Sequence, residues 1–392
     1  MTKNLRWPIF DKKEINIVSK AILKSNSCAS EGRNVGFTTE FEKKFAKFHK
    51  KKYGVACFNC TVGLEALLIC SEIGPGDEVL VPAYTYISSV TSIIRVGAIP
   101  KFIDINPHTL CTDLELIKKK ITKKTKAVML VHFGGYMSDI LKIKNYFKNK
   151  KIRVIEDAAQ AHGSKRNGKY PGEIDAGAIF SFQRNKNMCS GEGGMLLTNK
   201  KDIAKKFREF IWHGTKPGKS NIHNFVGTNF RITEFQSAIL LEQLKKLKKW
   251  NSTRMNLCKK LDKSLKEVSF VNINSQEDLQ VHARHLYSFR LKEYVSQKMR
   301  EKIIKRLKIS KIFCNGGYAY PVYKSPIFKK KNFPKYFKDS NKQVYKKWIK
   351  YIDNLYLHNS EEACKRTIIL PHFIFLSDKN IHKKILNILK KL

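Results

Sequence analysis

Short apolar segments alternate with amphipathic segments through the first 245 or so residues, and this alternation limits the folds open to the chain more than any other feature. Buried strands are predicted at residues 78–86, 99–105, 127–135, 152–157, 177–182 and 194–199. Segments with helical spacing, such as TVGLEALLICSEI and DILKIKNYFKNK, lie between most of them. This order favours an α/β fold, a mainly parallel sheet with helices on both faces. Ligands of such sheets bind at the carboxyl ends of the strands.

The pattern changes after residue 231, where apolar residues recur with a helical period. These residues are Phe235, Ile239, Leu240, Leu244 and Leu247. They predict a long helix that joins two domains. A strand is then expected at 282–291, and helices at 296–309 and 378–392. We therefore predict a large domain over residues 1–245, with an N-terminal helical segment, and a smaller α+β domain over residues 246–392.

The net charge of +43 first suggests a nucleic acid or another anionic surface as partner. The charge is nearly all lysine, however, and it is spread along the chain in runs such as IKKKITKKTK and FKKKNFPK. Sequence-specific nucleic-acid readers rely more on arginine and on interleaved aromatic residues. We favour solvated lysine-rich faces, which would also attract anionic substrates. A basic binding protein without enzymatic activity stays the alternative from another class.

Length and cysteine content narrow the class of protein further. The 392 residues with 42% hydrophobic content allow a sizeable core and more than one domain. No apolar run is long enough to cross a bilayer, and the first residues lack a signal-peptide pattern. Nine cysteines with scattered spacing fit a reducing compartment better than a disulfide framework. A cytoplasmic protein without membrane contact is expected.

Two residues beyond strand ends suggest specific chemistry. In VIEDAAQAHG an apolar strand runs into Asp157, whose carboxylate could enter a cleft or, with equal probability, cap a turn. Lys186 follows the next expected strand and lies among Phe182, Met188 and glycines, unlike a residue of a surface charge run. Pyridoxal phosphate needs this pair, because a lysine amine condenses with its aldehyde. A carboxylate keeps the ring nitrogen of the cofactor protonated. Each unit by which it raises the pKa of that nitrogen favours the protonated form by about 1.4 kcal/mol.

Other residues fit the same cofactor, although each also has a plainer interpretation. Cys60 and Thr61 are predicted to begin a helix. The free amides and the dipole at a helix start attract a phosphate, and the Thr61 hydroxyl adds a donor. Thr61 could equally be an ordinary helix cap. CFNC is a lone C-x-x-C, so a redox or zinc role is weakly supported. Tyr86 could stack on a flat ring or be a core aromatic.

Two further patterns argue against other cofactors. GEGG lacks the G-x-G-x-x-G spacing of a nicotinamide site, and its glycines more simply allow backbone to pack beside Lys186. His282 and His285 lie in a strand-like segment, and we interpret them as surface or structural residues rather than metal ligands. No metal site is predicted.

Seven segments in this order resemble the DegT/DnrJ family of sugar aminotransferases over nearly the whole chain. They are GRNVGFTTEFEKKFA, NCTVGLEALL, GPGDEVLVPAYTYISS, DINPHTLCTD, EDAAQAHGS, GEIDAGAIFSFQRNKNMCSGEGGMLLTN and GTNFRITEFQSAILLEQL. The resemblance implies a large domain of the aspartate aminotransferase-like type, called fold type I, and pyridoxal 5′-phosphate as cofactor. WPIFD, the lysine segment and YPVYKSPIF look most like the branch that includes glutamine:scyllo-inosose aminotransferase and 3-amino-5-hydroxybenzoate synthase.

The resemblance also implies a role for individual residues. Lys186 is implied to carry the cofactor and then move the proton, and Asp157 to pair with the ring nitrogen. The further cofactor contacts it implies are Gln160 near the ring hydroxyl, Tyr86 on the ring face, and Thr61, the Cys60 backbone and Ser181 on the phosphate. Asn229 is implied to reach the phosphate of a neighbouring subunit, which makes a homodimer the working unit. His162, Arg231 and Tyr318 are implied to lie near the substrate.

The implied reaction moves an amino group from L-glutamate or L-glutamine to a keto sugar or keto cyclitol. The resemblance places such a reaction in amino-sugar, polysaccharide or secondary-metabolite biosynthesis. An aromatising enzyme of the same family that eliminates water is the nearest alternative. The family's sugar dehydratases have histidine at the lysine position, so Lys186 counts against them. Cys60 stands where the family usually has glycine, and its side chain is expected to crowd the phosphate turn.

Overall fold

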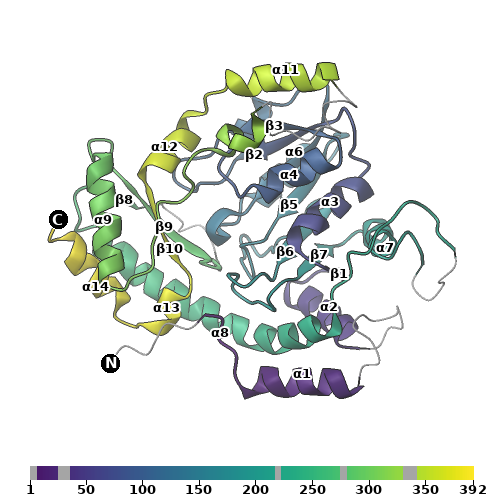
Figure 1. Cartoon of the computed structure of the whole chain (residues 1–392), viewed down its shortest axis with the longest axis horizontal. Helices are drawn as coiled ribbons and strands as arrows, with labels where there is room; N and C mark the ends of the chain where they lie inside the picture. Colours follow the sequence, from purple (N-terminus) through teal and green to yellow (C-terminus); the bar gives the residue numbers. More distant parts are fainter. Residues whose placement is uncertain (1–6, 25–35, 217–221, 274–279, 330–341) are drawn as a thin grey trace.

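A seven-stranded sheet forms the centre of the molecule (Figure 1). The computed structural model describes residues 7–24, 36–216, 222–273, 280–329 and 342–392. The strands are β1 (Tyr53–Cys57), β2 (Glu78–Pro82), β3 (Ile99–Ile103), β4 (Thr125–Val131), β5 (Arg153–Asp157), β6 (Gly177–Ser181) and β7 (Gly194–Thr198). Their order is β1-β7-β6-β5-β4-β2-β3, and only β7 runs antiparallel to its neighbours. The carboxyl ends of the other six strands therefore share one edge.

Helices cover both faces of this sheet because side chains of each strand alternate between the faces. The helices of the large unit are α1 (Lys12–Lys24), α2 (Phe37–Phe48), α3 (Cys60–Cys70), α4 (Ser88–Arg95), α5 (Leu114–Lys118), α6 (Ile140–Phe147) and α7 (Lys201–Phe210). One face packs against α3, α4 and α7, and the other against α2, α5 and α6. None of the described helices is long and apolar enough to span a membrane.

A second, antiparallel sheet of three strands lies to one side (Figure 1). Its order is β10 (Thr367–Pro371), β9 (Leu286–Leu291) and β8 (Val271–Ile273). Four helices accompany it: α9 (Gln297–Ile309), α12 (His358–Arg366), α13 (Ile374–Ser377) and α14 (Ile381–Leu389). This sheet packs its apolar side chains into a core of its own with α9, α14 and the far half of α8 (Glu234–Leu265).

The long helix α8 passes beneath both sheets and joins the two cores (Figure 1). Its first half packs on the large sheet through Leu240, Leu244 and Leu247, and its second half on the small sheet. The predicted boundary at residue 245 therefore falls inside one continuous helix. In addition, α11 (Lys342–Asp353) packs through Trp348 on the core of the large sheet. The division into domains at 245 stays a prediction.

The six strands predicted in the first 245 residues are all present, as are the helices predicted at 296–309 and 378–392. The strand predicted at 282–291 begins four residues later, at Leu286. Two strands, β8 and β10, were not predicted, and β1 was recognised only as the strand-like segment that precedes the helix at Cys60. All three lie at an edge of their sheet, and β8 has only three residues.

The start of α2 depends on a carboxylate from another helix. Helix α2 has no side-chain cap of its own, and the amides of Phe37 and Thr38 donate to Glu234 at 2.5 and 3.3 Å. Glu234 is 2% exposed and sits in the first turn of α8. It therefore joins the start of α2 to the start of the long helix.

We expect Glu234→Ala to lower the free energy of unfolding by about 2–3 kcal/mol, because it leaves buried amides unpaired. Urea unfolding followed by circular dichroism measures this. Glu40→Ala is the matched control, since it removes an exposed ion pair with Lys44 and should cost less than about 1 kcal/mol. Equal losses in the two variants would contradict this role for Glu234.

Candidate active site

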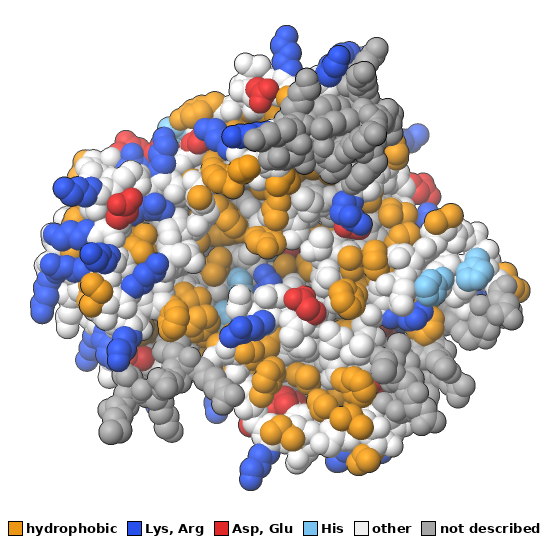
Figure 2. Space-filling view, in the orientation of Figure 1, with side chains coloured by type: hydrophobic (Ala, Val, Ile, Leu, Met, Phe, Trp, Pro, Cys, Tyr) orange, Lys and Arg blue, Asp and Glu red, His pale blue; other side chains and the backbone are white. Residues whose placement is uncertain are grey.

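A cavity of about 910 Å³ opens at the carboxyl edge of the large sheet, where the small sheet approaches it. Figure 2 shows this face of the molecule hollowed near its middle, with basic and histidine side chains at the bottom. The lining residues that matter for chemistry are Cys60, Thr61, Tyr86, Asp157, Gln160, Ser181, Lys186, Glu192, His285 and His372. The cavity thus brings together residues from segments that lie far apart in the sequence.

Asp157 ends strand β5 and lies on the cavity wall. Its Oδ2 accepts a hydrogen bond from the Ser89 hydroxyl at 2.7 Å, and its Oδ1 accepts one from the Ala159 amide at 3.1 Å. Sequence reasoning missed Ser89, although its position just after Tyr86 at the start of α4 offered a signal. These two donors fix the direction of a largely buried carboxylate.

Lys186 lies in the loop between β6 and β7. Several backbone hydrogen bonds hold this loop, among them Arg184 N to Gly191 O at 2.9 Å and Lys186 N to Gln183 O at 2.8 Å. The indole of Trp7 donates to Arg184 O at 3.0 Å, which ties the N-terminal segment to the loop. The loop is therefore rigid enough to aim the lysine amine into the cavity.

The amine of Lys186 forms no hydrogen bond or ion pair with any described residue. Burial lowers its pKa below the usual 10.5, and the negative charges nearby, including Asp157 and Glu192, oppose this only in part. A larger share of the amine is therefore neutral near pH 7 than for a surface lysine. A neutral amine is the form that attacks carbonyl groups and accepts protons.

Glycines after the lysine let the backbone pack closely, as the sequence predicted. A Cβ atom on Gly194 would lie 2.6 Å from the Asn59 carbonyl carbon and 2.8 Å from the Cys57 Sγ. Gly193 has a φ of 150° and accepts a hydrogen bond from Phe182 N through its carbonyl. Strand β7 can therefore lie against the start of α3 only with glycine at position 194.

The first turn of α3 offers an anion site on the same cavity. Asn59 caps the helix by accepting from Val62 N at 3.1 Å. The amides of Cys60 and Thr61 have no acceptor among the described residues, and the Thr61 and Ser181 side chains also line the cavity. Free amides at a helix start attract phosphate.

The side chain of Cys60 turns toward the sheet. Its Sγ lies 4.0 Å from both Asp157 Oδ1 and Ile179 O. Burial, with a contribution from the charge of Asp157, holds the pKa of this thiol well above its usual value, so it stays a neutral thiol. Cys57 and Cys60 are both free thiols, which leaves the redox and zinc interpretations of CFNC without structural support.

Tyr86 and Gln160 line the cavity, whereas Tyr318 is not among its lining residues. Tyr86 is 61% exposed on the cavity rim. Gln160 Oε1 accepts a hydrogen bond from Gly134 N at 2.6 Å. Tyr318 packs edge-on against Tyr84 with ring centroids 5.0 Å apart. The loop that carries Tyr318 is thus packed against the strand-end residue Tyr84.

Three further residues implied by the family resemblance, besides Tyr318, lie outside the cavity of this chain. Asn229 is exposed, and Arg231 lies over the Trp212 ring at 4.6 Å. His162 is fully buried behind Ser181, whose carbonyl oxygen it meets at 2.8 Å through Nε2. It packs between Phe180 and Phe182, so it is a core residue that supports the cavity wall and cannot reach a substrate.

Of the two interpretations given for His282 and His285, surface or structural, the surface one is wrong, because both residues are buried. His285 lines the cavity, and so does His372, which sequence reasoning did not single out. No group of histidine, cysteine or acidic side chains among the described residues is arranged to hold a metal ion. His285 and His372 come from segments that are distant in sequence, so no local motif indicated that both line the cavity.

These residues fit pyridoxal 5′-phosphate. The free amides of Cys60 and Thr61 suit its phosphate, the fixed carboxylate of Asp157 suits a protonated ring nitrogen, and the unpaired amine of Lys186 suits its aldehyde. All three groups line one cavity, which is the condition that the sequence-based interpretation required.

Comparison with known proteins identifies the family. Residues 9–350 match the DegT/DnrJ/EryC1/StrS aminotransferase family. The chain belongs to this family. It is 37% identical to a GDP-perosamine synthase of Caulobacter vibrioides over 69% of this chain and 73% of that one. It is also 34% identical to a protein called pleiotropic regulatory protein of Geobacillus stearothermophilus, over 74% of this chain and 77% of that one.

A solved structure of 3-amino-5-hydroxybenzoic acid synthase has a TM-score of 0.87 to this chain, with 25% identity, covering 98% of this chain and 97% of that one. An L-glutamine:2-deoxy-scyllo-inosose aminotransferase of Streptomyces lividus is also among the relatives, 30% identical over 73% of this chain and 71% of that one. The predictions of the family, of the fold type I α/β architecture, of an aminotransferase and of pyridoxal phosphate as its cofactor are confirmed.

Proposed function

We propose that this aminotransferase moves an amino group from L-glutamate or L-glutamine to a ketone on a sugar or cyclitol, in two half-reactions that share one pocket. The proposal rests on one observation: Lys186 and Asp157 line the same cavity, next to the first residues of α3. Bound pyridoxal phosphate supplies an aldehyde that captures amines and a ring that withdraws electrons.

Lys186 is assigned the chemical steps. Its amine holds the cofactor at rest, and the amino donor then releases it. With the cofactor bound, the free amine of Lys186 would accept the proton from the donor Cα in the first half-reaction and would return a proton to the acceptor carbon in the second. The lowered pKa of Lys186 suits both directions, because a base is most effective when its pKa lies near the working pH.

Asp157 is assigned to the ring nitrogen, where its charge keeps a proton. Ser89 and the Ala159 amide hold the carboxylate in place while the charge on the ring changes. Thr61, Ser181 and the Cys60 amide are assigned to the phosphate, Tyr86 to the ring face and Gln160 to the ring hydroxyl. Each of these residues lines the cavity, which supports the assignment.

A homodimer is proposed as the working unit. Asn229 lies outside the cavity of its own chain and is exposed, so it is available to a second copy. Phe58 and Tyr86, at the cavity rim, are exposed aromatic side chains of the kind that interfaces cover. In this arrangement Asn229 would reach the phosphate held by its partner, and Arg231 would approach the substrate there.

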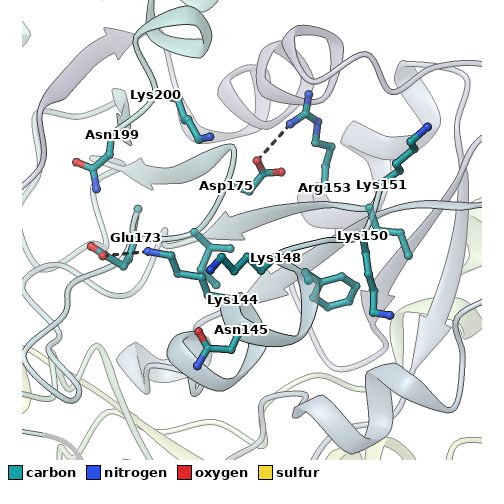
Figure 3. Close-up of a pocket in the computed structure, with 14 residues that line it drawn as sticks. Lys144, Asn145, Lys148, Lys150, Lys151, Arg153, Glu173, Asp175, Asn199 and Lys200 are labelled. Atoms are coloured by element: carbon teal, nitrogen blue, oxygen red, sulfur yellow. Dashed lines mark hydrogen bonds and ion pairs between the residues drawn. The ribbon is translucent and has the colours of Figure 1, made fainter.

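We place the protein in the cytoplasm and propose no nucleic-acid partner. Every cysteine among the described residues is a free thiol, which fits a reducing compartment. A second cavity, at the opposite end of the large sheet, is rich in lysine (Figure 3). Its carboxylates Glu173 and Asp175 pair with Lys144 and Arg153, while Lys150 and Lys151 point in opposite directions. Such cations do not converge on one ligand.

The purified protein should show a visible absorption band from bound cofactor, and borohydride should shift this band and fix the cofactor covalently on the Lys186 peptide. Each donor is then mixed with a panel of keto sugars and keto cyclitols, and amino products are sought by mass spectrometry. A colourless protein that binds nucleic acid with a steep salt dependence would instead support the basic binding protein.

The same panel separates transamination from the aromatising alternative. Transamination replaces a carbonyl oxygen by an amino group, whereas elimination yields a product lighter by one water. The presence of lysine at position 186 favours transamination over the histidine-dependent dehydratases.

A further inference from the structure

His285 lies between the small sheet and the lysine loop, and it lines the cavity together with Lys186. Its Nδ1 lies 2.9 Å from Oδ1 of Asn187, one residue beyond the lysine. His372 stacks on its ring at 5.4 Å, with 27° between the ring planes, and His372 N donates to His285 O at 3.0 Å. The imidazole is therefore held by the Asn187 amide and the His372 ring, and a backbone hydrogen bond fixes the segment that carries it.

The orientation of the Asn187 amide decides which nitrogen of His285 carries the proton. Asn187 is buried, and its Nδ2 donates to the Ala283 carbonyl at 2.6 Å. The same carbonyl accepts from Nε of the buried Arg254 at 3.2 Å, so it can only be an acceptor. Oδ1 of Asn187 therefore faces His285, and as an acceptor it requires a proton on Nδ1.

The other ring nitrogen of His285 must then be an unprotonated acceptor. Nε2 has no partner among the described residues, and it is not one of the buried polar atoms cut off from solvent. Because His285 lines the cavity and Nδ1 faces Asn187, Nε2 is the polar atom it can offer to a ligand. Burial, reinforced by the charges of Lys186 and His372, keeps the pKa of His285 well below its usual value, so the ring stays neutral.

We propose that His285 Nε2 accepts a hydrogen bond from a hydroxyl group of the amino acceptor and so selects polyhydroxylated ketones. This inference rests on the proposed function and names a residue that determines specificity within it. The lone pair of His285 Nε2 on the cavity wall attracts hydroxyl groups, which donate hydrogen bonds, and repels carboxylates, which only accept them. His285 therefore acts in the second half-reaction, with the sugar or cyclitol, and is not needed for the amino-acid donor.

The test uses the cofactor-loaded enzyme, the best acceptor from the panel and the full set of its monodeoxy analogues. With wild-type enzyme, removal of one particular hydroxyl should lower kcat/KM about 10- to 100-fold. His285→Phe should lower kcat/KM for the parent acceptor by a similar factor, yet change little for that one analogue. His285→Gln, which offers an oxygen acceptor, should recover part of the loss. Single-turnover reaction with the amino donor that is active in the panel should fall much less in both variants than the reaction with the ketone, which also shows that they fold.

The outcomes separate this inference from the proposed function. A loss that is uniform over parent and analogues, or no loss at all, would overturn the role of His285 while amination itself persists. Failure of the wild-type enzyme to aminate any ketone in the panel would overturn the proposed function, and with it the inference.

The protonation state offers an independent check that needs no substrate. In enzyme with ¹⁵N-labelled histidine, a resonance that disappears in His285→Gln should show a protonated Nδ1 and a bare Nε2. A proton on Nε2 would overturn the proposal whatever the enzyme aminates.

Discussion

Replacing Lys186 by alanine is expected to abolish turnover, with a loss of at least about 10⁴-fold in kcat. The physical reason is that no other amine among the described residues lines the cavity, so nothing replaces it as carrier or as base. Cofactor should remain bound through its phosphate and ring contacts. Single-turnover absorption measurements with L-glutamate report the proton transfer, and mass spectrometry after borohydride treatment should find no covalent cofactor.

Lys148→Ala is the matched control, because Lys148 is an exposed lysine on the second cavity at the far end of the sheet. Its activity should equal that of the wild type. Appreciable amination by Lys186→Ala would mean that another group moves the proton, and the assignment of the site would fail. Loss of activity in both variants would point instead to a general dependence on positive charge.

The convergence of Asp157 and Lys186 was predictable from sequence because it follows from topology. Each residue lies at or just beyond the carboxyl end of a strand, and parallel strands place these ends on one edge. Strands β5 and β6 are direct neighbours in the sheet, so the two residues had to be close. The anion site at Cys60 and Thr61 was predictable for a similar local reason, a strand that turns into a helix.

The roles of the histidines were not predictable in this way. The placement of His285 depends on hydrogen bonds to the Ala283 carbonyl from Asn187, 96 residues away in sequence, and from Arg254, 29 residues away. His162 matched a family position, yet its ring enters the core between two phenylalanines. A sequence pattern records which residues are present, but long-range packing decides which way such a side chain points.

The domain boundary illustrates the same limit. Helical periodicity predicted the long helix, but it did not show that one half packs on each sheet. Nor did any local pattern indicate that Trp348, late in the chain, packs against the large sheet, where its indole donates to Pro100 O at 2.7 Å. Contacts of this kind depend on the tertiary fold, which brings together residues that are far apart in the sequence.

Replacing Asp157 by asparagine should lower kcat roughly 10³-fold or more, equivalent to about 4 kcal/mol in the barrier. The amide has nearly the same shape but no charge, so it cannot hold a proton on the ring nitrogen, and proton removal from the donor Cα slows. The fold should be kept, because the remaining oxygen can accept from the Ala159 amide while the new NH2 group donates to the Ser89 hydroxyl. Circular dichroism and cofactor titration check the fold and the binding.

Asp175→Asn is the matched control, since Asp175 precedes the same pair of strands at the opposite edge of the sheet and pairs with a partly exposed Arg153. It should change kcat by less than about twofold, because the lost ion pair is half in solvent and far from the cavity. The decisive quantity is the Cα proton-transfer rate, measured with α-deuterated L-glutamate. In Asp157→Asn this step should become fully rate-limiting, whereas in Asp175→Asn the isotope effect should match the wild type. Near-normal kinetics in Asp157→Asn would mean that another group protonates the ring, and the electrostatic role of this carboxylate would have to be abandoned.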